Sequence, residues 1–221
     1  MFDSKNEIDV LNFISESKEL SDAFIYYLYN NKSISSPYHN IDHMMTMISM
    51  IIDCKGYRFQ DTETFSEQDW NDIVVATIFH DFNHSAGRYD DKINIINAKE
   101  AYITYCTSKN MKCKHIICDL IDATQYPYID NAHTSMQFFM REIDVLSGIY
   151  HNHYFTHTFI GLRTELRKED IRGCIDNTML FNEMITQDFK FMYSKHIVDS
   201  CKEGINYNNV FESLERILSW Q

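Results

Sequence analysis

Glycine and proline are scarce in this chain, with 6 and 2 positions among 221 residues. Tight turns depend on these two residue types, so a sandwich or barrel of repeated hairpins has too few turn-forming positions. Hydrophobic residues make up 44% of the sequence and aromatic residues 14%, which is enough to fill a sizeable core. We therefore expect an all-α protein, and a length of 221 residues fits a single domain.

Positive charge is also in short supply. The chain has 20 Lys and Arg against 32 Asp and Glu, which gives a formal net charge of -12 at pH 7. This charge repels the phosphates of DNA and RNA, and no basic stretch offsets it, so a nucleic-acid polymer is not an expected partner. Acidic helical proteins often pair, and a homodimer is an open expectation.

Long apolar runs and paired cysteines are missing as well. No run approaches the roughly 20 apolar residues that cross a bilayer, and the segment Met1–Glu7 lacks the apolar core of a signal peptide. The six cysteines are irregularly spaced and form no CxxC pair, so we expect reduced thiols. Cys113, His115 and Cys118 match no structural-zinc spacing. These absences predict a cytoplasmic protein with no membrane partner.

Apolar residues recur every three to four positions through most of the chain, which is the pattern of amphipathic helices. Residues 8–28 predict one helix or a broken pair, and residues 41–52 predict a helix that follows Pro37. The segment Ser66–Asp69 has the spacing of a capping box and predicts a third helix that runs into His80-Asp81. Further helices are expected over residues 93–106, 113–124, 132–147, 152–167, 178–200 and 209–219. The sequence thus predicts a bundle of about nine helices.

Two pairs of histidines are each four residues apart, His39 with His43 and His80 with His84. On a helix this spacing returns a side chain to within about 40° of the same face, so each pair is expected to project two imidazoles into one neighbourhood. Asp81 adds a carboxylate directly after His80. Nitrogen and oxygen ligands together suit Zn, Mn or Fe, whereas a Mg site is usually all oxygen. The pairs therefore predict a site for one or two divalent metal ions.

These residues resemble the HD-domain metal-dependent phosphohydrolases, a family named for adjacent His and Asp ligands that His80-Asp81 matches. The segment Tyr38–His43 is similar to the YHNxxH of cyclic-nucleotide phosphodiesterases, and His80–His84 is similar to their HDxxH. The resemblance implies four metal ligands in this chain: His43, His80, Asp81 and Asp144.

The resemblance also implies two catalytic histidines. His39 would protonate the leaving oxygen, and His84 would support a second metal ion and the attacking water. Thr124 lies in a segment similar to one beside that second ion, and Asn40 is expected to be a hydrogen-bonding partner close to the metal. 

Two more residues are candidates for substrate contact. Arg163 would either face the substrate phosphate or form a surface ion pair with Glu165. Gln187 with Phe191 is a candidate for holding the base, although its spacing is shifted from that of the phosphodiesterases.

A group of small bacterial proteins, described only as predicted HD phosphohydrolases, has a layout similar to this one. The specific motifs cover residues 37–148, which are expected to form the metal-site core of one domain spanning residues 1–221. Residues 150–221 are expected to complete the substrate pocket.

The sequence therefore predicts a metal-dependent phosphohydrolase, preferably a phosphodiesterase that hydrolyses a nucleotide, with a cyclic nucleotide as one candidate. A nucleotidase or nucleoside triphosphate hydrolase on the same metal site is the alternative among enzymes. A non-catalytic nucleotide sensor that keeps an HD fold is the alternative from another class. All three readings expect a small-molecule nucleotide as the ligand.

Overall fold

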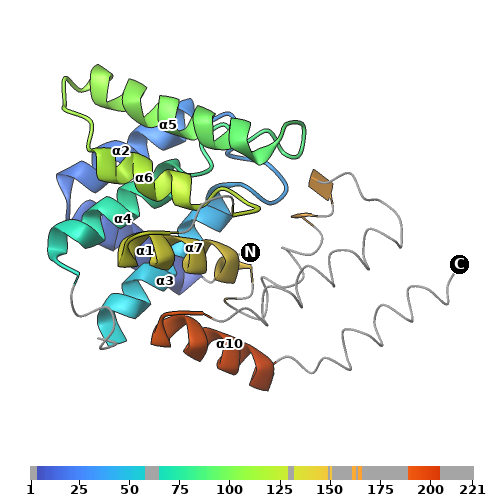
Figure 1. Ribbon diagram of the computed structural model, residues 1–221. Coiled ribbons are helices and arrows are strands. Elements are labelled where there is room, and N and C mark those ends of the chain that lie inside the picture. Colours follow the sequence, from blue (N-terminus) through green and yellow to red (C-terminus); the bar gives the residue numbers. More distant parts are fainter. Residues whose placement is uncertain are drawn as a thin grey trace, which may run out of the picture.

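The computed structural model describes residues 4–57, 65–128, 132–148, 150, 161–162, 164–165 and 189–204. Within these residues the regular structure is α-helical and contains no strand, which confirms the predicted all-α class. Figure 1 shows the helices packed as one bundle. Their bounds are α1 Ser4–Ser15, α2 Lys18–Asn30, α3 Ile41–Tyr57, α4 Glu67–Phe79, α5 Asp91–Ser108, α6 His115–Ala123, α7 Ser135–Ser147 and α10 Met192–Gly204.

The helix predicted over residues 8–28 is a broken pair. α1 ends at Ser15 and α2 begins at Lys18, where the Ser17 side chain accepts a hydrogen bond from the backbone N–H of Leu20 (3.4 Å). This bond satisfies one of the backbone donors that every helix leaves free at its start, so a new helix begins at this position.

Of the helix predicted over residues 178–200, the structure describes residues 189–200, and the first three of these are not helical. Residues 189–191 are not helical, because the Glu142 carboxylate accepts hydrogen bonds from the backbone N–H groups of Lys190 (2.6 Å) and Phe191 (3.2 Å). α10 then runs from Met192 to Gly204. The helix predicted over 209–219 lies outside the described residues, as does most of that predicted over 152–167.

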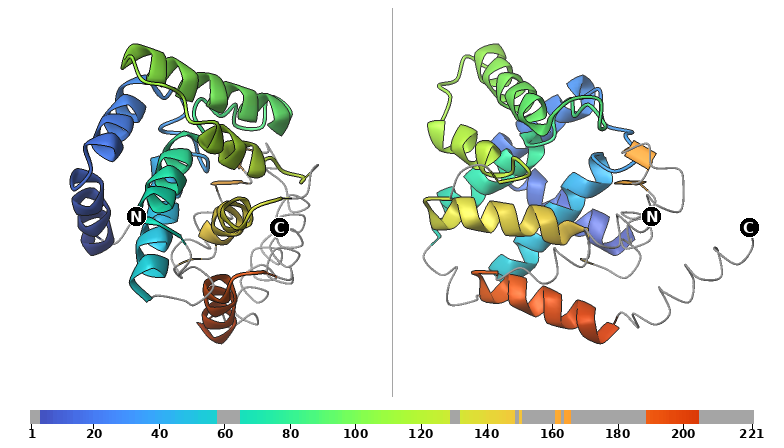
Figure 2. Two further views of the ribbon diagram at one scale, coloured as in Figure 1. Left: turned by 60° about the vertical axis from the view of Figure 1, so that its left-hand side comes forward. Right: turned by 45° about the vertical axis from the view of Figure 1, so that its right-hand side comes forward.

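Helix α4 lies at the centre of the bundle (Figure 2), where it contacts α2, α3, α5, α6 and α7. Its start is the predicted capping box: Ser66 Oγ accepts from Asp69 N–H (3.2 Å), and the Asp69 carboxylate accepts from Ser66 N–H (2.8 Å). Every residue from Ile73 to Phe79 is buried, as expected for a helix surrounded by others. The chain leaves this helix at His80-Asp81, so the candidate ligands emerge directly from the core.

Aromatic side chains fill the core on both sides of α4. Phe79 and Phe82 stack with ring centroids 5.5 Å apart, close to Tyr105. At the other end Phe191 packs edge-on against Phe139, with centroids 5.3 Å apart, and is only 1% exposed. Phe191 is thus part of the core, which argues against its half of the suggested pair with Gln187, and Gln187 lies outside the described residues.

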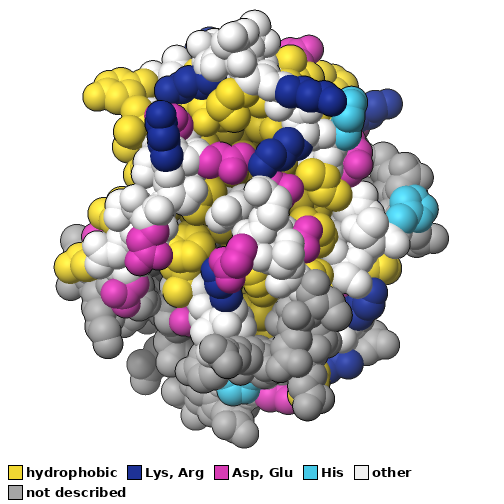
Figure 3. Space-filling view, turned by 90° about the vertical axis from the view of Figure 1, so that its left-hand side faces the viewer, with side chains coloured by type: hydrophobic (Ala, Val, Ile, Leu, Met, Phe, Trp, Pro, Cys, Tyr) yellow, Lys and Arg dark blue, Asp and Glu magenta, His cyan; other side chains and the backbone are white. Residues whose placement is uncertain are grey.

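The surface agrees with the mixed charge of the sequence. On the face shown in Figure 3, basic, acidic and hydrophobic side chains are interspersed. Among the described helices, none is both long and apolar enough to span a membrane.

Candidate metal centre

The two histidine pairs do not lie on single helices, as their spacing of four residues had suggested. Helix α3 begins at Ile41, after His39, and α4 ends at Phe79, before His80 and His84. Neither pair therefore lies within one helix, and its members join different clusters: His43 and His80 lie with Asp81, whereas His39 and His84 lie with Glu165. The prediction that each pair lies on one helix is wrong, but His39 and His43 do share one neighbourhood, with ring centroids 5.9 Å apart. Both clusters could hold a metal ion.

Asn40 fixes the start of α3 and with it His43. The Asn40 side-chain oxygen accepts hydrogen bonds from the N–H groups of Asp42 (2.8 Å) and His43 (3.1 Å), and its amide nitrogen donates to the carbonyl of Ser36 (2.7 Å). Asn40 thus acts as the N-cap of α3, a position at which asparagine is favoured.

Replacing Asn40 with alanine is expected to lower the free energy of unfolding by about 0.5–2 kcal/mol, the usual cost of losing such a cap. Urea unfolding followed by circular dichroism measures this difference. Asn40→Asp keeps the accepting oxygen and is expected to retain most of the stability. Equal stability of the alanine variant and the native protein would contradict a capping role.

Four ligand atoms from three parts of the chain meet in the first cluster. His43 Nε2 lies 3.2 Å from His80 Nε2, and Asp81 Oδ2 lies 3.0 Å from His80 Nε2 and 3.3 Å from His43 Nε2. Asp144 Oδ1 lies 3.2 Å from His43 Nε2 and 3.6 Å from His80 Nε2. A first-row metal ion with bonds of about 2.0–2.2 Å holds neighbouring ligand atoms roughly 3.0–3.6 Å apart. The separations among His43, His80 and Asp81 therefore fit ligands that share one ion, and Asp144 places a further carboxylate beside the two imidazoles.

The tautomers of both imidazoles follow from their other ring nitrogens. His80 Nδ1 lies 2.8 Å from the carbonyl oxygen of Thr77, which can only accept, so Nδ1 carries the proton. His43 Nδ1 lies 3.0 Å from Ser147 Oγ, whose own hydrogen is donated to the carbonyl of Asp144 (2.7 Å), so here too Nδ1 is the donor. Both Nε2 atoms are therefore left with lone pairs that face each other, the arrangement of metal-binding histidines.

The carboxylates of this cluster need a cation. Asp81 Oδ2 is buried and has no hydrogen-bond partner in the structure, and a bare buried carboxylate oxygen is costly. Burial would lower the pKa of His80, yet Asp81 and Asp144 raise it well above its usual value. Burial would raise the pKa of Asp81, yet the nearby histidines hold it well below its usual value. The cluster thus stabilises positive charge, and a divalent ion bound there would supply that charge.

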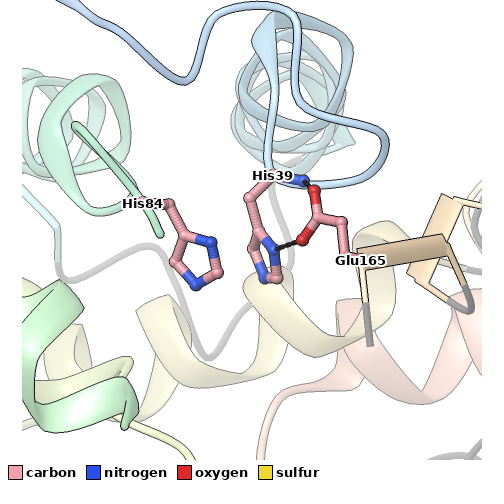
Figure 4. A group of neighbouring side chains, drawn as sticks. All are labelled: His39, His84 and Glu165. Carbon is pink, nitrogen blue, oxygen red and sulfur yellow. Dashed lines mark hydrogen bonds and ion pairs between the residues drawn. The ribbon is translucent and has the colours of Figure 1, made fainter. Parts of the chain in front are cut away.

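The second cluster is built on Glu165 (Figure 4). One oxygen of its carboxylate lies 2.6 Å from His39 Nδ1, and the other accepts from the backbone N–H groups of Tyr38 (2.6 Å) and His39 (2.8 Å). The His84 ring faces the His39 ring, with centroids 3.6 Å apart and planes inclined by 31°. Glu165 therefore fixes both the backbone and the ring of His39.

Charge at His39 follows from these contacts. Burial would lower the pKa of His39, but Asp81 and Glu165 outweigh it and raise the pKa above its usual value. Burial would raise the pKa of Glu165, but the hydrogen bond from His39 lowers it below its usual value. An imidazolium paired with a carboxylate is the favoured state, and its Nδ1–H is held by Glu165.

Both clusters open into one cleft with a volume of about 410 Å³. Asp81 and Asp144 line it, whereas His43 and His80 lie behind them and are 4% and 1% exposed. His39, His84 and Glu165 line the same cleft, and so does Thr124, whose hydroxyl donates to the carbonyl of Ile121 (2.8 Å). A ligand in the cleft would therefore contact the carboxylates and His39 together.

Sequence reasoning found some of these residues and missed others. Its expected ligands His43, His80, Asp81 and Asp144 meet in space, and their role as ligands stays a prediction. Glu165, considered only as an ion-pair partner of Arg163, instead contacts His39, and Ser147 was not considered at all. Arg163 and Gln187 lie outside the described residues.

The chain matches no protein-family model, no curated protein and no solved structure. The structure and the residues of the site therefore carry the functional argument.

Proposed function

We propose that this protein is a metal-dependent phosphoric ester hydrolase, and that its substrate is a phosphodiester of a nucleotide, with a cyclic nucleotide as one candidate. The observation that carries the proposal is the approach of two carboxylate oxygens, from Asp81 and Asp144, to within 3.0–3.6 Å of two imidazole nitrogens, beside His39 in one cleft. The resemblance of the ligand order, His43, then His80-Asp81, then Asp144, to HD-domain phosphohydrolases supports it.

The chemistry of the ligand set decides which ions fit. Two nitrogens and two oxygens suit Mn, Zn or Fe better than Mg. When bound, one or two such ions would lower the pKa of a water molecule and offset the charge of the phosphate. His43, His80, Asp81 and Asp144 would hold the first ion, and Asp81, with His84 and Thr124 nearby in the cleft, would face a second.

His39 supplies the acid in this proposal. Its Nδ1–H is held by Glu165, which leaves the opposite ring nitrogen to give a proton to the leaving oxygen. An alkoxide leaves poorly unless it is protonated, and a placed general acid typically contributes about 100- to 10,000-fold. The pairing with Glu165 keeps His39 protonated and oriented, so the proton is available at neutral pH.

The lining of the cleft favours a diester over a polyphosphate. Four carboxylates line it, from Asp81, Asp91, Asp144 and Glu165, and its described lining residues include neither Lys nor Arg. One or two divalent ions can offset the single negative charge of a phosphodiester, but the several charges of a triphosphate would meet the remaining carboxylates. This distribution argues against the nucleoside triphosphate hydrolase.

A panel of substrates tests the proposal. Purified protein is incubated with Mn and with cyclic nucleotides, linear dinucleotides, nucleoside monophosphates and triphosphates, and the products are separated by chromatography. Hydrolysis of diesters that disappears on chelation is the expected result. Release of phosphate from monophosphates would favour the nucleotidase, and binding of nucleotides without turnover at any metal concentration would favour the sensor.

A further inference from the structure

The outer wall of the cleft is rich in tyrosine. Tyr89, Tyr126 and Tyr128 line it together with the residues of the two clusters. Tyr89 is 64% exposed and Tyr126 is 44% exposed, so much of each ring is free of protein contacts. Tyr89 comes from the segment between α4 and α5, and Tyr126 from the segment between α6 and α7. Two segments far apart in sequence thus present exposed rings to one cleft.

Contacts with neighbouring residues position Tyr126. Its backbone N–H donates to the Asp91 carboxylate (2.7 Å) at the start of α5, and its ring meets that of Tyr128 edge-on, with centroids 5.6 Å apart and planes at 84°. The Arg141 guanidinium lies over the Tyr128 ring at 4.5 Å, and Arg141 Nε donates to the carbonyl of Ala123 (2.7 Å). This chain of contacts runs from α7 to the cleft. It holds the Tyr126 ring in place before any ligand arrives, which reduces the entropy lost on binding.

We infer that Tyr126, with Tyr89, is the stacking surface for the base of the nucleotide. The inference rests on the proposed function, because the phosphate of the same ligand would lie at the metal ion that Asp81 and Asp144 would help to hold. The residue that the sequence suggested for the base, Phe191, is buried against Phe139 and does not line the cleft. Among the described aromatic side chains that line the cleft, Tyr126 and Tyr89 are the ones classed as exposed, so they are the candidates for contact with the base.

Size and charge restrict what can occupy this wall. A volume of about 410 Å³ is near the lower end of the range of roughly 300–1,000 Å³ for small-molecule sites, so one nucleotide fits better than an oligonucleotide. Asp91 adds a negative charge beside Tyr126, which disfavours a second phosphate there. A base is uncharged and planar, and aromatic side chains bind every base through its ring face.

Ligands with and without a base test the inference. Binding of the four nucleoside monophosphates and of ribose 5-phosphate to Mn-loaded protein is measured by titration calorimetry. At least one nucleotide is expected to bind about 5- to 100-fold more tightly than ribose 5-phosphate, the range of one stacked base. Chromatography checks that the ligand stays intact, and if it is hydrolysed, KM values replace Kd values in the same comparison.

Variants of Tyr126 locate the effect. Tyr126→Ala is expected to abolish the preference for the nucleotide over ribose 5-phosphate, whereas Tyr126→Phe keeps the ring and the preference. Tyr29→Ala is the matched control, because Tyr29 is 85% exposed and does not line the cleft. Equal binding of nucleotides and ribose 5-phosphate by the native protein, or an unchanged preference in Tyr126→Ala, would overturn the inference.

Failure of the proposed function gives a different result. In that case ribose 5-phosphate shows no binding that depends on Mn. The contribution of the base is then measured with adenosine and guanosine, which have no phosphate. If these nucleosides bind, and if Tyr126→Ala weakens the binding while Tyr29→Ala does not, the stacking surface is supported even though the proposed function fails. If the native protein binds neither nucleoside, the inference of a stacking surface is refuted.

Discussion

The Asp81→Asn variant is expected to lose the metal ion while keeping the fold. The Asp81 oxygen lies 3.0 Å from His80 Nε2 and 3.3 Å from His43 Nε2, in the middle of the ligand set. The change keeps the shape of the side chain and removes its charge. Losing partners outside the ligand set already costs about 10- to 100-fold in metal affinity, so we expect more than about 100-fold for a direct ligand.

Metal content and thermal unfolding measure this effect. A ligand that binds only the folded state raises the melting temperature, so added Mn should raise it for the native protein and much less for Asp81→Asn. Asp122→Asn is the control, because Asp122 pairs with Lys99 on the surface (2.6 Å), and it should keep the Mn response. Equal Mn responses of the native protein and Asp81→Asn would refute the proposed ligand set.

The sequence predicted the local parts of the fold well. The capping box Ser66–Asp69 depends on neighbours within three residues, so its spacing is visible in the chain. For residues 8–28 the sequence left one helix or a broken pair open, and the structure shows the pair. The start of α10 was missed because the carboxylate that accepts from the backbone just before this helix comes from Glu142, 48 residues before Lys190. Such a contact leaves no trace in periodicity.

In the candidate site, too, the sequence revealed local features but not contacts between distant residues. The family resemblance identified the expected ligands, but geometry from helical spacing did not, since neither histidine pair lies within one helix. The partners that orient the imidazoles are distant: Ser147 is 104 residues from His43, and Glu165 is 126 residues from His39. These contacts exist only in the folded bundle, so only the structure reveals Glu165 as a functional candidate.

Removing the acid is the second large effect that we expect. His39→Gln should lower kcat by about 100- to 10,000-fold for a diester with a poor leaving group, since that group leaves only with a proton. Glu165→Gln should give a smaller loss, because the ring keeps its place while the carboxylate that raises the pKa of His39 is gone. Both variants should retain the first metal ion, because neither residue is an expected ligand of that ion.

The pH dependence and the leaving group separate this role from a structural one. The acid works only when protonated, so activity should fall as pH rises through the raised pKa of His39, and Glu165→Gln should move this fall to lower pH. With a p-nitrophenyl diester, whose leaving group needs no proton, His39→Gln should lose far less activity. A loss of equal size for both kinds of leaving group would mean that His39 serves the structure of the cleft and that another group supplies the proton.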